Sequence, residues 1–203
     1  MNLPNRLTVL RVLMIPIMML IWLFPAAQMG IELPDLQIQL FNSSLTVSLA
    51  VKNLICLAVF ILAAITDYFD GMIARKKNLI TTFGKFADPI ADKLLVSTMF
   101  VLFVADGIIP VVPVALMIIR DTIVDGCRML AAQNGVVVAA GYMGKVKTVI
   151  QMISIVLILL NNLPFELYRL PVSDFMLWFA AFTSVASGIS YFNQLKEYIF
   201  ESK

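Results

Sequence analysis

The chain has 203 residues, of which 61% are hydrophobic and 14% are charged, and its formal net charge is +2. Soluble domains are roughly 45–50% apolar and about 25% charged, so this composition predicts an integral membrane protein, with residues 1–203 forming one domain. The small net charge argues against a nucleic-acid partner. Histidine is absent, which excludes imidazole as a catalytic group or a metal ligand.

Six stretches are apolar enough to cross a bilayer as helices, which takes about 20 residues each. They are expected near residues 7–24, 49–66, 88–104, 111–130, 144–160 and 175–192. The predicted fold class is therefore an all-α membrane protein with six transmembrane helices. Pro4 suits a first helical turn, which predicts a short interfacial helix before the first span.

The segments at the ends of the expected spans also allow structural predictions. Segment 30–48 is polar enough for an external loop that contains a short strand or turn. Pro89 is expected in the first turn of the third helix, and Ser173 and Asp174 are expected to cap the sixth.

The basic residues are distributed unevenly between the two sides of the predicted bundle. Six spans place both termini on one side, where thirteen of the fifteen lysines and arginines fall; Lys52 and Arg169 fall on the other. Positive charge accumulates on the cytoplasmic side of membrane proteins. We therefore expect a multi-pass membrane protein, with both termini and the polar end of the second and third helices facing the cytoplasm.

Four carboxylates lie between the second and third apolar stretches: Asp67, Asp70, Asp88 and Asp92. If both segments are helical, each pair lies on one helix face, because residues three or four apart are neighbours on a helix. Acids in or beside a span usually pair, face water or hold cations. Two such faces brought together would form a set of hard oxygen ligands suited to Mg²⁺ or Mn²⁺.

This acid cluster suits phosphoryl chemistry. Four adjacent carboxylates repel one another unless cations compensate them, and two divalent ions could also hold the attacking and leaving oxygens of a phosphoryl displacement. One carboxylate could accept the proton of an attacking hydroxyl. The structural alternative is an ion-pair network at the membrane surface with Arg75, Lys85 and Lys93.

The same stretch resembles the signature of the CDP-alcohol phosphotransferase family, D-x2-D-G-x2-A-R-x8-G-x3-D-x3-D. Every fixed position of that signature is present, at Asp67, Asp70, Gly71, Ala74, Arg75, Gly84, Asp88 and Asp92. The resemblance implies two metal ions per site, bound by the four aspartates, with Asp92 also acting as general base. It implies contacts to the CDP-linked lipid from Pro4, Asn5, Thr8, Gly71, Ala74, Arg75, Thr81 and Gly84. It also suggests a homodimer.

The implied reaction is attack by an alcohol hydroxyl on the β-phosphorus of CDP-diacylglycerol, with release of CMP. Segments 2–11, 139–148 and 187–192, together with Arg120 and Asp121, resemble family members that use glycerol 3-phosphate as acceptor. The charge pattern favours a phosphorylated acceptor independently, because Arg120, Lys145 and Lys147 could surround a phosphate with charge-assisted hydrogen bonds. The alternative is ordinary positive-inside charge in contact with lipid headgroups.

Other functions remain open at this point. The same chemistry could use phosphatidylglycerol, serine or an inositol phosphate as acceptor. A divalent-cation transporter also places acids in spans, although Arg75 between the acids would repel cations. A purely structural membrane protein is a third alternative. Asp121, Asp125 and Arg128 are expected to pair within the membrane or to pack helices.

Overall fold

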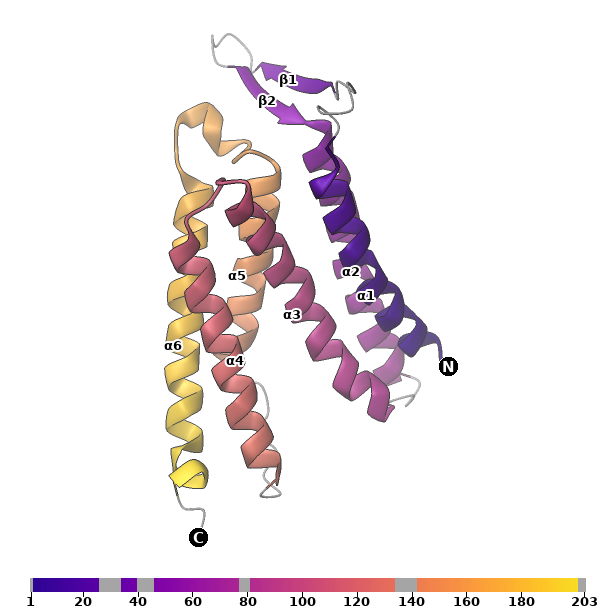
Figure 1. Cartoon of the computed structure of the whole chain (residues 1–203), viewed down its shortest axis with the longest axis vertical. Helices are drawn as coiled ribbons and strands as arrows, with labels where there is room; N and C mark the ends of the chain where they lie inside the picture. The colour runs from indigo at the N-terminus through magenta and orange to yellow at the C-terminus, as the bar shows by residue number, and fades with distance from the viewer. Residues whose placement is uncertain (1, 26–33, 40–45, 77–80, 134–141, 201–203) are drawn as a thin grey trace. The chain divides into compact units, whose positions relative to one another are not determined.

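The computed structural model describes residues 2–25, 34–39, 46–76, 81–133 and 142–200, and some side chains within these helices and strands are not described. Figure 1 shows long helices and one small hairpin. In chain order the elements are α1 (Leu3–Leu23), β1 (Asp35–Gln39), β2 (Thr46–Ala50), α2 (Val51–Lys76), α3 (Thr82–Ala105), α4 (Val111–Gln133), α5 (Tyr142–Leu159), the 3-10 helix η2 (Phe165–Tyr168) and α6 (Val172–Phe200).

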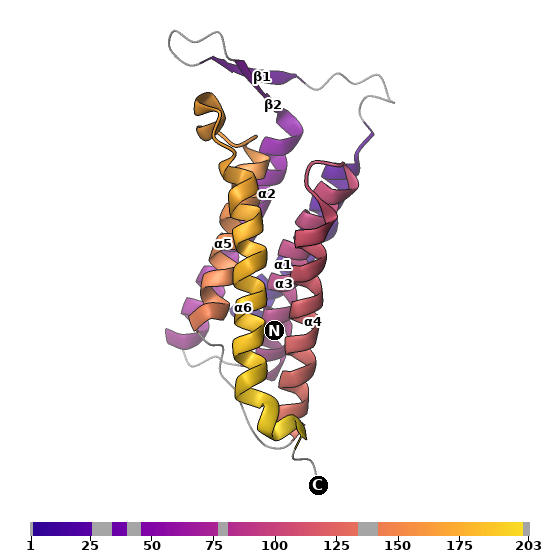
Figure 2. The ribbon, with the colours of Figure 1, turned by 90° about the vertical axis from the view of Figure 1, so that its left-hand side faces the viewer.

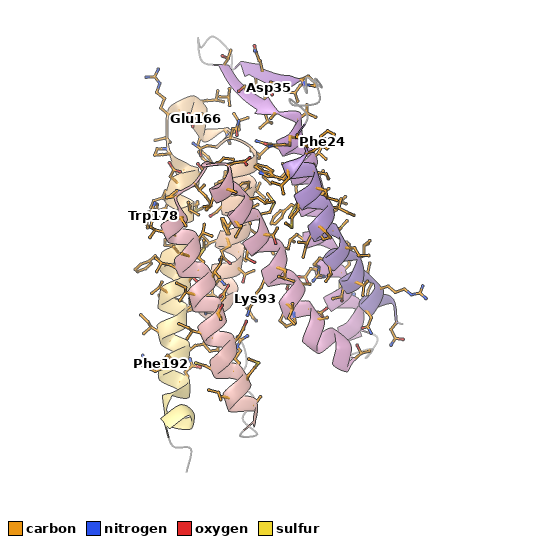
Figure 3. All side chains as sticks on the ribbon, viewed as in Figure 1. Phe24, Asp35, Lys93, Glu166, Trp178 and Phe192 are labelled. Carbon is orange, nitrogen blue, oxygen red and sulfur yellow. The ribbon has the colours of Figure 1, made fainter. Side chains whose placement is uncertain are left out.

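Four of the described helices are long and apolar enough to cross a membrane: α1, α2, α5 and α6. These helices expose many large apolar side chains. On α1, Leu20 is 71% exposed while Arg11 is 0% exposed. Trp178 and Phe192, which Figure 3 labels on α6, are also exposed. Large apolar side chains facing outward along these helices suit a hydrocarbon surround, so the chain is a multi-pass, mainly helical membrane protein.

The helices occupy the expected stretches, but several of their ends differ. α2 continues past residue 66 to Lys76, so Asp67 and Gly71 lie on regular helix. α3 begins at Thr82 because Thr81 caps it: the Gly84 N–H donates to Thr81 Oγ1 at 3.0 Å. Pro89 therefore lies inside α3, and its expected place in the first turn is wrong.

The beginnings of α6 and α1 also differ from the predicted ones. α6 begins at Val172, and the Phe175 N–H donates to the Pro171 carbonyl. Ser173 and Asp174 therefore lie in the first turn rather than at the N-cap. α1 runs without a break from Leu3, so the described residues contain no separate interfacial helix before it.

Segment 30–48 contains the expected strand within its described part. β1 and β2 pair antiparallel, with Asp35 opposite Ala50 and Gln39 opposite Thr46, and β2 leads directly into α2. The side chain of Asn161 ties this hairpin to a distant turn, because its amide donates to the Ser48 carbonyl at 2.6 Å.

The chain divides into two compact units. The first comprises Met1–Leu102 and Val156–Leu170, and the second comprises Phe103–Ile155 and Pro171–Lys203. In the first unit α1 packs along α2, as Figure 1 shows. In the second, α4 packs along α6, and Figure 2 shows this pair. Among the described residues, each unit holds a cluster of charged side chains that contact one another.

Candidate functional site

The first cluster begins with a polar stripe on α1. Asn5, Thr8 and Arg11 are spaced three apart, which places them on one face of the helix, and all three are buried. Buried polar groups are nearly always hydrogen-bonded. The partners of this stripe lie on α2 and α3, at the positions of the acid cluster.

Arg11 brings two of the predicted metal ligands together. Its Nη1 atom lies 2.8 Å from Asp67 Oδ1 on α2 and 2.8 Å from Asp92 Oδ1 on α3. The two carboxylate oxygens therefore lie within twice that distance of each other. The Arg11 side chain is fully buried, whereas those of Asp67 and Asp92 are 35% and 34% exposed. The carboxylates are therefore held from the interior and remain open on another side.

The rest of the stripe holds the beginning of α3. Thr8 Oγ1 donates to Asp88 Oδ1 at 2.7 Å, and Thr81 Oγ1 donates to Asn5 Oδ1 at 2.8 Å. A Cβ at Gly84 would lie 3.3 Å from Thr81 Oγ1 and 3.6 Å from Asp88 Oδ2. The small residue thus lets the α3 backbone approach the polar stripe closely.

Several predicted contacts to the nucleotide fall at this cluster, and others cannot be placed. Asn5, Thr8, Thr81 and Gly84 meet around Asp88. Gly71 lies one turn beyond Asp67 on the same face of α2. The side chains of Pro4, Asp70, Ala74 and Arg75 lie outside the described residues.

The donor atoms of this cluster fit a divalent ion. Carboxylate oxygens are the ligands that Mg²⁺ and Mn²⁺ prefer, and Asp67 and Asp92 are accessible from outside. Among the described side chains, no group of three ligating residues is close enough to hold one ion. The predicted four-aspartate site includes Asp70, and its geometry is not fixed without that side chain.

Sequence reasoning missed Arg11, which it counted only as cytoplasmic positive charge. The available signal was its position: Arg11 continues the spacing of Asn5 and Thr8 on a helix whose other faces are apolar. The structural alternative expected Arg75, Lys85 and Lys93 as partners of the acids. The structure places a fully buried arginine from α1 between Asp67 and Asp92, and the side chains of Arg75 and Lys85 lie outside the described residues.

The second cluster joins α4, α5 and α6. Lys147, which is 5% exposed, donates from Nζ to both Asp121 oxygens at 2.5 Å. Arg120 Nη1 donates to Asp121 Oδ1 at 2.8 Å, and Arg120 Nη2 donates to Ser187 Oγ. Asp121 thus pairs with Arg120 and Lys147, the cations predicted to bind the acceptor phosphate.

Next to this cluster, Arg128 packs on an aromatic ring. Its Nη2 donates to the Tyr191 hydroxyl at 2.6 Å, and its guanidinium carbon lies 4.8 Å from the ring centroid, a cation–π geometry. Lys145 is exposed at the beginning of α5. The structure therefore brings together two of the three predicted phosphate-binding cations, Arg120 and Lys147, through their shared carboxylate.

Comparisons with known proteins agree with the resemblance inferred from the signature. A model of the CDP-alcohol phosphatidyltransferase family matches residues 1–186, a range that runs through both compact units. Members of this family generally depend on a divalent metal ion.

Individual relatives match over most of the chain. A Bacillus subtilis protein named CDP-diacylglycerol–glycerol-3-phosphate 3-phosphatidyltransferase is 43% identical over 193 residues, which are 95% of this chain and 94% of the relative. A Rickettsia felis protein of the same name is 35% identical over 198 residues, 97% of each chain. A Salmonella choleraesuis protein of that name is 34% identical over 158 residues, 76% of this chain and 74% of the relative. The chain belongs to the CDP-alcohol phosphatidyltransferase family.

Proposed function

We propose that this protein transfers the phosphatidyl group of CDP-diacylglycerol to sn-glycerol 3-phosphate, giving phosphatidylglycerophosphate and CMP. The observation that carries the proposal is the convergence of Asp67 and Asp92 from two helices onto Arg11. It occurs in a chain that aligns almost end to end with relatives named for this reaction.

The acid cluster is the reaction centre in this proposal. Asp67, Asp70, Asp88 and Asp92 hold divalent ions, Mg²⁺ or Mn²⁺, with two ions per site. When bound, such ions neutralise the phosphates and polarise their oxygens. The hydroxyl of the acceptor attacks the β-phosphorus, the bond to CMP breaks, and Asp92 takes the hydroxyl proton. Arg11 holds one oxygen of Asp92, and the exposed third of that side chain is where the hydroxyl reaches it.

The nucleotide binds where α1, α2 and α3 supply small and hydroxyl-bearing residues. Thr8, Thr81 and the amide of Asn5 offer hydrogen-bonding groups, and Gly71 and Gly84 leave the backbone accessible. Pro4, Ala74 and Arg75 complete this set. The guanidinium of Arg75 is suited to bidentate hydrogen bonding with a phosphate.

The acceptor phosphate binds to the cations of the second cluster. Lys147 and Arg120 are buried next to each other, and charge-assisted hydrogen bonds to a phosphate are about twice as strong as neutral ones. Asp121 keeps these cations compensated while no anion is bound. Lys145, exposed at the beginning of the same helix, adds long-range attraction for the phosphate.

The remaining proposals concern the whole chain. α3 and α4 have 24 and 23 residues, which is long enough to span a bilayer of about 30 Å, and Asp92 on α3 and Asp121 on α4 are held in ion pairs. With them the chain has six spans and both termini in the cytoplasm of a bacterial-type cell. The family match across both units supports a single domain of residues 1–203, and we propose that it assembles as a homodimer.

A CMP-release assay tests this proposal. The purified chain is given CDP-diacylglycerol and, in separate reactions, glycerol 3-phosphate, phosphatidylglycerol, serine or an inositol phosphate, with and without Mg²⁺. We expect CMP release with glycerol 3-phosphate that requires the metal. Faster release with another acceptor would overturn the assignment of the acceptor. Metal flux into proteoliposomes without CMP release would instead favour a transporter.

A further inference from the structure

The side chain of Arg120 lies directly against the backbone of α6 at Gly188. A Cβ at that position would lie 2.8 Å from Arg120 Cγ and 3.4 Å from Arg120 Nε. Contacts of 2.8 Å are essentially never made by real Cβ atoms. Because Cγ is close to the root of the side chain, Arg120 could relieve this overlap only by leaving its rotamer or by moving α4 away from α6.

The polar end of Arg120 is fixed on two sides. Nη1 donates to Asp121 Oδ1 and Nη2 donates to Ser187 Oγ, the residue before Gly188. The side chain is 10% exposed, and its Nε–H is buried without a hydrogen-bond acceptor among the described residues. A buried unsatisfied donor is costly, and an oxygen of an anionic ligand would satisfy it.

A second helical glycine, Gly126 on α4, offers a comparison. A Cβ there would meet no atom of the described residues within 4 Å. Glycine weakens a helix interior relative to alanine. At position 188 the close approach of the Arg120 side chain gives a local reason for glycine.

We propose that Gly188 is a positioning residue for binding of the acceptor phosphate: the absence of its side chain sets the conformation in which Arg120 presents its Nε–H to an anionic oxygen. This inference rests on the proposed function, since it takes glycerol 3-phosphate as the source of that oxygen. Gly188 acts through Arg120 and makes no contact with substrate of its own.

The test compares Gly188→Ala with Gly126→Ala in the full-length protein. Both variants place one methyl group in a helix, so their intrinsic gains in helix stability match. CMP release is measured while each substrate is varied at saturation of the other. We expect Gly188→Ala to raise KM for glycerol 3-phosphate roughly tenfold, the effect of one lost charge-assisted hydrogen bond. KM for CDP-diacylglycerol should stay unchanged, and Gly126→Ala should change neither constant.

A double variant separates positioning from general packing. Arg120→Ala removes Cγ and with it the overlap, so Gly188→Ala should have almost no further effect on KM for glycerol 3-phosphate in that background. An unchanged KM in Gly188→Ala would overturn the inference, and so would equal effects in the two backgrounds. If Gly188→Ala alone is too unstable to assay, the double variant is compared with Arg120→Ala, and a further rise in KM there refutes the inference. Wild-type protein that releases no CMP with glycerol 3-phosphate would overturn the proposed function as well.

Discussion

The two polar clusters are built with opposite charges. In the first unit one cation, Arg11, bridges two carboxylates from different helices. In the second unit one carboxylate, Asp121, bridges two cations, again from different helices. An uncompensated buried charge is very costly, and Arg11 and Asp121 each lower that cost for the opposite charges that they contact.

The clusters differ in the sign of the charge that predominates among their described side chains. In the first, the carboxylates of Asp67 and Asp92 contact Arg11, and Asp88 accepts a hydrogen bond from the Thr8 hydroxyl. In the second, Arg120 and Lys147 contact Asp121. This difference supports the proposals that the first cluster holds divalent metal ions and that the second binds the phosphate of the acceptor.

The largest expected effect is on the proposed base. Asp92→Asn should reduce kcat by about 10²–10⁴-fold, the usual range for loss of a general base, while largely sparing folding. The reduction is measured by CMP release at saturating substrates. Asp174→Asn, at an exposed position on α6, serves as control and should behave as wild type. Wild-type rates in Asp92→Asn would remove the residue from the chemistry.

Removing the bridging cation of the first cluster should affect stability. Arg11→Met removes the cation that Asp67 and Asp92 share. Loss of one partner of a buried ion pair costs about 3–5 kcal/mol, reduced here to roughly 2 kcal/mol because a third of each carboxylate is exposed. Chemical denaturation in detergent measures this loss. Arg6→Met, on an exposed position of the same helix, should cost almost nothing, and equal losses in the two variants would contradict the bridge.

Removing a cation from the second cluster should affect one substrate only. Lys147→Ala should raise KM for glycerol 3-phosphate roughly tenfold, as expected for a lost charge-assisted hydrogen bond, and change KM for the lipid much less. Lys145→Ala should have a smaller effect in the same direction, because its side chain is exposed. If KM for glycerol 3-phosphate were unchanged in both variants, neither lysine would belong to a phosphate site.

The smallest effect concerns the hydroxyl that holds Asp88. Thr8→Val keeps the shape of the side chain and removes the bond from Oγ1 to Asp88 Oδ1. A single hydrogen bond of this kind contributes about 1 kcal/mol, so we expect KM for CDP-diacylglycerol to rise a few-fold at constant KM for glycerol 3-phosphate. The same kinetic assay measures both constants. If only KM for glycerol 3-phosphate changed, Thr8 would contribute to binding of the acceptor and not of CDP-diacylglycerol, which would contradict the account.

The helices were predictable from hydropathy, whereas their ends depended on local contacts. Apolar runs located each helix, because burial and lipid exposure both select apolar residues. The start of α3 depended on the cap that Thr81 provides, a bond that hydropathy does not detect. The beginning of α6 at Val172 was missed because Ser173 resembled a cap.

The acids of the candidate site could be predicted from the sequence, whereas their counter-charges became evident only in the structure. The spacing of Asp88 and Asp92 alone places them on one helix face. Arg11 lies more than fifty residues from the nearest of the acids, and only tertiary packing brings it to them. The contact between Gly188 and Arg120 likewise depends on how closely α4 and α6 approach, which no local pattern specifies.

Direct measurement of metal binding tests the central claim, that the carboxylates of α2 and α3 together chelate divalent ions. The purified full-length protein is titrated with Mn²⁺ in detergent, and the free ion is followed by electron paramagnetic resonance. Wild-type protein should bind Mn²⁺ with no substrate present, Mg²⁺ should compete, and an Asp67→Asn/Asp88→Asn variant that still folds should lose this binding. Equal Mn²⁺ binding by the variant and the wild type would contradict the claim.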